Sequence, residues 1–294
     1  MKNITKLGLG TVQWGVPYGI SNQSGKTPPE AVAEILLAAQ RYGVSILDTA
    51  SQYGNAESTL GKNVLSGFNV VTKTPSFGTP YIADSQARQL LDTFDQSLNN
   101  LGLRSTYGIL IHHAADLLVP GGEKLVSSLL ALKEKNKVKK IGVSIYDGSQ
   151  IDQILNRFKP DIVQAPVNVL DQRLLTSGKL QQLKDLGVEI HIRSVFLQGL
   201  LLMSLDKLPT YFGPISPLLT QWHSAAEAQG MTLTQAALSF VRDIPYVDAV
   251  LVGVESPEQF HTCANDFSIT QSFDARGLSC ENPAFVNPAL WKTL

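Results

Sequence analysis

The stretch VSILDTASQYGNAESTLG, residues 44–61, begins as a short apolar run and continues in polar and small residues. Asp48 ends the apolar run, and Tyr53 follows five residues later. A short run that is apolar on both faces is typical of a buried strand in a parallel sheet. An acid and a phenol placed directly after such a strand indicate a functional site at its carboxyl end.

The same pattern recurs along the chain. Together with VSILDTA (44–50), seven further β-branched, apolar runs give eight predicted strands: KLGLGTV (6–12), FNVVTKT (68–74), YGILIHH (107–113), KKIGVSI (139–145), PDIVQAPV (160–167), VEIHIRSVF (188–196) and VDAVLVGV (247–254). Runs of this length suit parallel strands that are covered by helices on their outer face.

Helical patterns separate the predicted strands. TPPE (27–30) predicts a capping box, with proline at the first helical position and Gly43 at the end of the helix. An apolar stripe predicts a second helix from Asp84 to Gly102. Further helices are predicted at 122–137, 148–157, 174–186, 216–229, 232–242 and 257–265. Strand and helix alternate throughout.

This alternation predicts an α/β fold: a single (β/α)8 TIM barrel over residues 1–294, with the active site at the C-terminal ends of the strands. A doubly wound open sheet is the alternative. The segments 197–215 and 266–294 are irregular and rich in Gly, Pro and Ser, and we expect them to be loops over the site.

Composition limits the kind of partner. The 294 residues are 44% hydrophobic, and 24 Lys and Arg against 25 Asp and Glu give a net charge of −1. Such a chain has no global field that attracts nucleic acid or an acidic membrane, so we expect a small-molecule partner. Two cysteines, Cys263 and Cys280, and the lack of a signal peptide or membrane span predict a cytoplasmic protein. We expect no metal site, and the oligomeric state is open.

Polar residues end six of the predicted strands, and in a barrel these ends meet at one mouth. They are Asp48, Lys73, His112, Ser144, Gln164 and Arg193. A phenol has a reference pKa of about 10, which a neighbouring ammonium lowers. We therefore expect Lys73 to acidify Tyr53, Asp48 to keep Lys73 charged, and His112 to hydrogen-bond a substrate oxygen. Such a proton relay to a carbonyl needs a hydride donor from a cofactor.

With these residues and motifs, the chain resembles the aldo-keto reductase family. The resemblance rests on LGLGT (7–11), LDTASQYG, VVTK, LGLRSTYGILIHH, KKIGVS, VQAPVN and LVGVESPEQ (251–259). It implies reduction of an aldehyde or ketone to an alcohol with NADPH or NADH as cofactor. The catalytic tetrad of the family then falls on Asp48, Tyr53, Lys73 and His112, with Tyr53 as the general acid.

The resemblance also implies a cofactor extended across the barrel mouth, with Ser144 and Gln164 holding its carboxamide. The candidate cofactor-binding residues are Gly10, Thr11, Ser144, Gln164, Arg193, Ser194, Gly253, Ser256 and Gln259. SPEQ (256–259) predicts a second capping box at the start of a helix. The amides of this helix start could bind a cofactor phosphate, or the motif could simply be the cap of an ordinary helix.

The sequence departs from the family pattern in three respects, the third of which involves two residues. Ile145 stands where many relatives carry asparagine, and Arg193 stands where an aromatic ring commonly stacks on the nicotinamide. A guanidinium can also stack, or it can bind an anionic substrate. Gly253 and Gln259 stand where relatives selective for NADPH tend to place cations, so the preference between NADH and NADPH is open.

Other interpretations of these residues exist. One is a regulatory barrel that binds the nucleotide with little turnover, and another is a lyase that forms a Schiff base through Lys73. Lys73 and Asp48 could also be an ordinary ion pair. For the substrate pocket, we expect a wall of mixed character formed by Trp14, Tyr18, His113, Phe196 and Tyr211.

Overall fold

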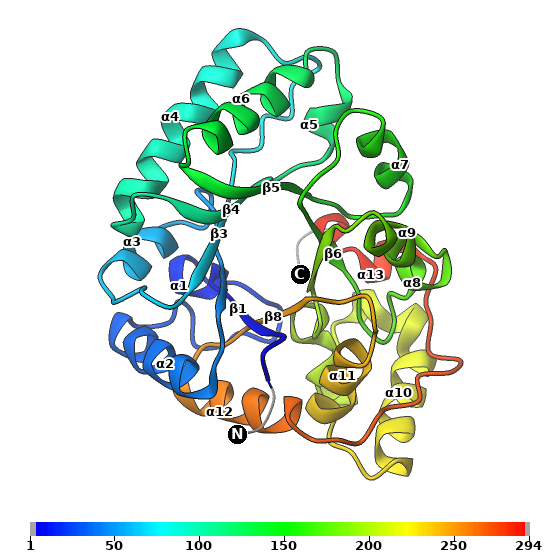
Figure 1. The fold of residues 1–294 in the computed structure, drawn as a ribbon. Coiled ribbons are helices and arrows are strands. Elements are labelled where there is room, and N and C mark those ends of the chain that lie inside the picture. The colour runs from blue at the N-terminus through cyan, green and yellow to red at the C-terminus, as the bar shows by residue number, and fades with distance from the viewer. Residues whose placement is uncertain (1–3, 292–294) are drawn as a thin grey trace.

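The computed structural model describes residues 4–291, in which eight parallel strands close into a barrel (Figure 1). Each strand pairs with the next along the chain, and β1 pairs with β8. The strands are β1 (Leu7–Gly10), β2 (Ile46–Asp48), β3 (Asn69–Lys73), β4 (Thr106–Ile111), β5 (Val138–Ser144), β6 (Ile162–Pro166), β7 (Glu189–Arg193) and β8 (Ala249–Gly253). All eight predicted strands are confirmed, and the open sheet is excluded.

Helices surround the barrel on its outside (Figure 1). They are α1 (Val12–Gly15), α2 (Pro29–Tyr42), α3 (Ala56–Gly61), α4 (Asp84–Leu101), α5 (Ala115–Leu118), α6 (Glu123–Glu134), α7 (Ser149–Leu155), α8 (Arg173–Thr176), α9 (Lys179–Asp185), α10 (Ser216–Ala228), α11 (Leu233–Arg242), α12 (Pro257–Phe267) and α13 (Pro283–Val286). The helix predicted at 174–186 is two helices, because Gly178 adopts a left-handed conformation (φ 71°) between α8 and α9.

Short 3-10 turns make up much of the segment predicted as an irregular loop at 197–215. They are η1 (Leu197–Leu202), η2 (Leu205–Lys207) and η3 (Thr210–Ile215), and η4 (Pro288–Leu290) lies near the end of the chain. Buried side chains of this segment pack in one cluster with α10 and with Phe273 and Val286 of the C-terminal tail. The Trp222 indole donates a hydrogen bond to the Leu201 carbonyl, which fixes α10 to the segment.

The start of α2 differs from the predicted capping box. Pro28, with ψ 146°, is the N-cap, and no side chain caps the helix. A residue that precedes proline is driven to extended backbone, so Pro29 forces Pro28, and not Thr27, to be the last residue outside the helix. The Thr27 hydroxyl is buried without a partner among the described residues. Proline at the first helical position and Gly43 at the end are confirmed.

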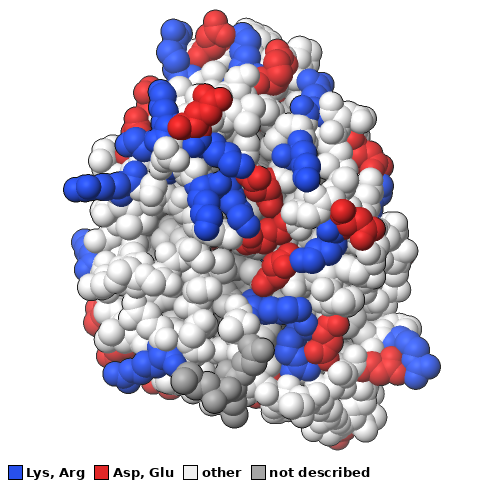
Figure 2. All heavy atoms as spheres, viewed as in Figure 1, with Lys and Arg blue, Asp and Glu red and all other residues white. Residues whose placement is uncertain are grey.

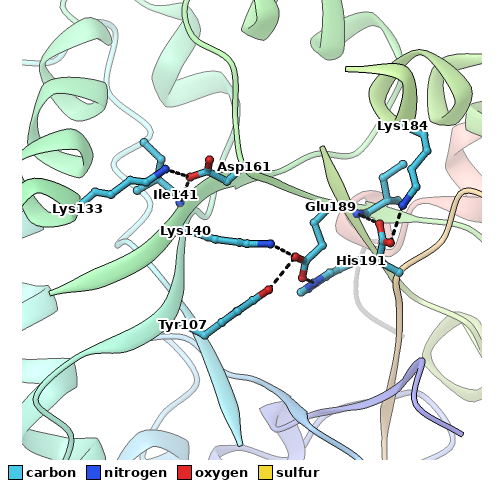
Figure 3. A network of polar contacts seen from close by, with 10 residues as sticks. Tyr107, Lys133, Lys140, Ile141, Asp161, Lys184, Glu189 and His191 are labelled. Atoms are coloured by element: carbon cyan, nitrogen blue, oxygen red, sulfur yellow. Dashed lines mark hydrogen bonds and ion pairs between the residues drawn. The ribbon is translucent and has the colours of Figure 1, made fainter. Parts of the chain in front are cut away.

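Ion pairs occupy the end of the barrel where the strands begin (Figure 3). Asp161 precedes β6 and binds both the Lys133 ammonium and the Ile141 amide of β5. Asp248 precedes β8 and makes the equivalent contacts, with Lys184 and with the Ile190 amide of β7. Each carboxylate therefore supplies an acceptor for the backbone of a neighbouring strand.

Glu189, the first residue of β7, is the centre of a network inside this end of the barrel (Figure 3). Its carboxylate accepts hydrogen bonds from Tyr107 (2.8 Å) and Lys140 and contacts the His191 ring (2.6 Å). Burial alone would raise the pKa of Glu189, but the contacts with His191 and Lys140 lower the pKa to about 2. The network fills the end of the barrel opposite the site with paired charges.

The face seen in Figure 2 carries acidic and basic side chains next to one another around the barrel opening, in keeping with these pairs. No helix between residues 4 and 291 combines the length and the apolar character needed to cross a bilayer.

Replacing Glu189 with Gln tests the network. The folded-state pKa of about 2 lies below the ordinary 4.5, so the carboxylate stabilises the fold above pH 4.5 and loses this contribution as the pH falls towards 2. The difference in unfolding free energy between wild type and E189Q should therefore shrink over that interval, as measured by urea unfolding. Exposed Glu134→Gln is the control, and a pH-independent difference for E189Q would contradict the role of the charge.

Candidate active site

A cavity of about 640 Å³ opens where the strands end. Its wall includes most of the candidate residues: Gly10, Thr11, Asp48, Tyr53, His112, Ser144, Gln164, Arg193, Ser194, Gly253 and Gln259. Lys73 lies behind the wall, buried at 2% exposure, and Ser256 lies outside it. The strand register brings these residues together, since Gly10 pairs with Asp48 and Ser144 pairs with Gln164.

Lys73 and Asp48 form a buried ion pair at the base of the cavity. The ammonium lies 2.7 Å from each carboxylate oxygen of Asp48 and donates to the Thr49 carbonyl at 2.9 Å. Burial lowers the pKa of Lys73, and Asp48 opposes that effect. With three acceptors around it, the ammonium is held as a hydrogen-bonded cation.

Gln164 is coupled to this pair. Its amide nitrogen donates to the Asp48 carboxylate at 2.7 Å. The Asp48 carboxylate therefore accepts hydrogen bonds from both Lys73 and Gln164. The sequence did not predict the contact between Gln164 and Asp48. The carbonyl oxygen of Gln164 is not used in that bond and remains available as an acceptor.

Tyr53 lies against Lys73 and His112. The Lys73 ammonium is 4.9 Å from the centre of the Tyr53 ring, and the His112 ring meets it edge-on at 5.7 Å. The expectation that Lys73 lowers the pKa of Tyr53 is wrong for this state: burial and the Asp48 charge raise that pKa well above its ordinary value. Because Asp48 compensates the lysine charge, desolvation of the phenolate decides the direction. Tyr53 therefore keeps its proton at neutral pH.

His112 is a neutral imidazole. Burial and the nearby Lys73 and Arg193 charges lower its pKa to about 3. Its backbone amide donates to the Thr74 hydroxyl at 3.2 Å, which fixes the end of β4, while Nδ1 has no partner among residues 4–291. A neutral histidine beside the Tyr53 ring can donate to or accept from a carbonyl oxygen.

Arg193 reaches across the cavity wall from the end of β7. Its guanidinium donates to the Ser194 hydroxyl at 3.1 Å and to the Ile145 carbonyl at 3.0 Å, and it lies 4.5 Å from the centre of the Tyr146 ring. The residue that departs from the family pattern is thus held in one orientation by contacts with the segment after β5.

The loop after β7 has an unusual backbone. Ser194, Leu197 and Gln198 have φ of 61°, 49° and 55°, values in the left-handed region that non-glycine residues rarely adopt. The Gln198 carbonyl accepts from the Ile20 amide at 3.1 Å, and its side chain donates to the Tyr18 hydroxyl at 3.1 Å. These bonds join the loop to the segment after α1, beside the cavity.

The start of α12 provides a second polar wall. The Ser256 hydroxyl accepts from the Gln259 amide at 3.2 Å, as a capping box requires. The Gln259 side chain binds the Glu255 amide at 2.8 Å and not that of Ser256, so only half of the predicted box is present.

The cavity residues fit an extended nucleotide cofactor. The Thr11 hydroxyl and Gln13 Oε1 are buried in the wall without partners among the described residues, so they are available to a ligand. At Gly10, an added Cβ would have no neighbour closer than 3.9 Å and would stand in the open cavity. At Gly253 it would lie 2.3 Å from the Gln13 side chain, so glycine leaves room for that amide.

The expected substrate wall is only partly present. Tyr18 and Phe196 line the cavity, and Trp14, His113 and Tyr211 do not. The Trp14 indole is fully buried and donates to the Val254 carbonyl. The Tyr211 hydroxyl donates to the Ala284 carbonyl, and the partly exposed His113 ring lies 3.9 Å from Asp116, outside the cavity wall.

Sequence reasoning missed several wall residues, among them Gln13, Tyr146 and Gln198. Gln13 lies in α1, three residues after β1, and Tyr146 lies two residues after β5, so their nearness to strand ends could have indicated them. Gln198 had no signal beyond its loop. Of the two irregular segments, the first supplies Gln198, Gly199 and Leu202 to the wall, and residues 268–291 supply none. The described tail packs on α10 and the 197–215 segment instead.

The Aldo/keto reductase family model matches residues 6–275. The chain belongs to this family. An NADH-specific methylglyoxal reductase of Escherichia coli strain K12 is 25% identical, with 87% of each chain covered, and an aldo-keto reductase of Mycobacterium sp. strain KMS is 28% identical, with 72% and 71% covered.

Solved structures share the fold. An aldo-keto reductase from Bacillus halodurans in its holo form superposes with a TM-score of 0.73 at 18% identity and covers 93% of this chain and 89% of its own. The glycerol dehydrogenase of Gluconobacter oxydans gives 0.69 at 19% identity, with 92% and 88% covered.

Membership makes the protein an NAD(P)H-dependent oxidoreductase that reduces carbonyl groups. The regulatory alternative finds no support in these comparisons, since the relatives carry reductase names. The Schiff-base alternative conflicts with the geometry, because the Lys73 ammonium is hydrogen-bonded to Asp48 and Thr49 and has no free lone pair.

Asp48→Asn should destabilise the protein by about 3–5 kcal/mol, because it leaves the Lys73 charge buried without its partner. The double variant Asp48→Asn/Lys73→Met removes both charges and should recover most of that loss. Urea unfolding of the three proteins measures both changes. If D48N unfolds at the wild-type urea concentration, the pair does not hold the site together.

Proposed function

We propose that the protein reduces a small aldehyde or ketone, with Tyr53 as proton donor and NADH as the preferred cofactor. The observation that carries the proposal is a protonated phenol beside a cation at the wall of a cavity that fits a nucleotide. When bound, the cofactor supplies the hydride that the carbonyl carbon receives.

In this proposal the protein's own residues handle the proton. Tyr53 donates its hydroxyl proton to the carbonyl oxygen as negative charge develops there. The phenolate that remains is stabilised by the Lys73 ammonium, 4.9 Å from its ring centre, and Asp48 keeps this ammonium charged. The neutral His112 orients the carbonyl oxygen by a hydrogen bond. Ser144 and the free Gln164 oxygen hold the carboxamide of the cofactor.

The charges of the cavity wall support NADH over NADPH. Among the described residues of the wall, Arg193 is the only Lys or Arg, and it reaches towards Ile145. The wall at the start of α12 instead carries Glu255 and Glu258. A 2′-phosphate there would meet carboxylates and no cation. The E. coli relative named as NADH-specific agrees with this preference.

The proposal also covers the location of the protein in the cell and its binding partner. Both cysteines are free and buried, which supports a cytoplasmic location. A small carbonyl compound is the proposed partner, and nucleic acid is not.

Tyr53→Phe should lower the turnover number by a factor on the order of 100 to 10,000, because the variant removes the proton donor. NADH oxidation with a panel of aldehydes measures the rate, and fluorescence titration measures NADH affinity, which should stay near the wild-type value. Tyr81→Phe, an exposed tyrosine, is the matched control. A wild-type rate in Y53F rules out the acid role.

The wild-type protein should bind NADH at least about tenfold more tightly than NADPH, a difference of about 1.4 kcal/mol. Glu258→Arg should narrow the ratio of the two dissociation constants, because it replaces a carboxylate by a cation at the start of α12. Fluorescence titration with each reduced cofactor measures the ratio, and Glu134→Arg on α6 makes the same change in net charge away from the cavity. Equal affinities in the wild type would overturn the NADH preference.

A further inference from the structure

Arg193 is a cation of the cavity wall without an anionic partner. The structure gives no carboxylate within ion-pair distance of its guanidinium among residues 4–291. Other carboxylates near the cavity are engaged or lie elsewhere: Asp48 is bound by Lys73 and Gln164, and Glu255 and Glu258 follow β8. A half-buried guanidinium without a counter-charge is a binding site for an anion.

The guanidinium is held in place before any ligand binds. Ser194, Ile145 and Tyr146 contact it from the protein side. A guanidinium carries five N–H donors, and within residues 4–291 only two of those of Arg193 have an acceptor. Because the side chain is already ordered, a ligand that accepts the remaining donors binds at a small further cost in conformational entropy.

The group lies at the reacting end of the cavity. Arg193 lines the same cavity as Tyr53, Tyr18 and His112, and its charge partly opposes the rise in the pKa of both tyrosines that burial causes, while adding to the fall in the pKa of His112. It reaches the carbonyl of Ile145, which directly follows Ser144 at the end of β5, and so extends away from the α12 side of the mouth. An anion bound by Arg193 therefore lies in the same cavity as the carbonyl that Tyr53 protonates.

We propose that Arg193 determines substrate specificity by binding a carboxylate or phosphate group of the substrate. This inference rests on the proposed carbonyl reduction and names its substrate class: aldehydes and ketones that carry an anionic group. The planar guanidinium matches the two oxygens of either anion with two parallel hydrogen bonds, which an ammonium cannot do.

Matched substrate pairs test the proposal. Glyceraldehyde 3-phosphate is compared with glyceraldehyde, and succinic semialdehyde with butanal, in NADH oxidation assays of the wild type, Arg193→Gln and Arg193→Lys. Arg88→Gln, an exposed arginine on α4, is the control for loss of a positive charge. The measured quantity is the ratio of kcat/KM for the charged member to that for the neutral member, which cancels any effect common to both.

In the wild type, at least one pair should favour the charged member by about tenfold or more, and which pair does so distinguishes phosphate from carboxylate. R193Q should abolish that preference, mainly through KM, R193K should retain part of it, and R88Q should retain all of it. A wild type that prefers both neutral members, or an R193Q variant that keeps the wild-type ratio, overturns the assignment.

The outcome is separable from a failure of the proposed function. If NADH binds but no aldehyde of either pair is reduced, the unreactive anions glycerol 3-phosphate and succinate are titrated into the protein with NADH. Binding that is lost in R193Q supports the anion site without the reaction, and the absence of such binding overturns it. If neutral aldehydes are reduced and the charged aldehydes have no higher kcat/KM, the result supports carbonyl reduction and overturns the anion site.

Discussion

The buried ion pair between Lys73 and Asp48 is the interaction on which the site depends. It joins the ends of β2 and β3, and through Gln164 it also reaches β6 on another side of the barrel. Neither charge would be stable alone at 2% and 5% exposure, because burial of an unpaired ion costs several kcal/mol. The pair therefore holds the Lys73 ammonium in a buried position against the ring of Tyr53.

Closure of the barrel makes this arrangement possible. A closed parallel sheet brings residues that are far apart in sequence to one rim, so Asp48, Lys73 and Gln164 meet although 116 positions separate the first from the last. The opposite rim is filled by carboxylates that bind lysines and strand amides, such as Asp161 and Asp248. The rim where the strands begin thus holds ion pairs that link neighbouring strands, and the candidate site lies at the rim where the strands end.

Much of the fold could be predicted from the sequence. The strands follow from apolar runs and the helices from stripes that end at residues such as Gly43, because both signals are local. Thr27 failed as a cap because the backbone preference imposed by Pro29 outweighed the hydroxyl.

The sequence predicted which side chains meet at the mouth of the barrel. It did not predict how burial and neighbouring charges together set the pKa of each side chain. The pKa of Tyr53 was predicted in the wrong direction, because burial and the Asp48 charge compete with the lysine in a way that spacing does not encode. Trp14 and Tyr211 were expected in the wall, but their polar atoms find backbone carbonyls elsewhere. Side-chain direction is a tertiary property, and a strand-end position does not settle it.

The loop after β7 has a consequence for how this protein can diverge. Ser194, Leu197 and Gln198 adopt left-handed backbone that costs on the order of 1–3 kcal/mol for each residue. Hydrogen bonds of Gln198 with Ile20 and Tyr18 tie this loop to the segment after α1. An insertion or deletion in the loop after β7 or in the segment after α1 would break the hydrogen bonds between them and change the conformation of both segments. New selectivity in descendants of this chain is therefore expected to arise by exchanging single side chains within a loop of constant length.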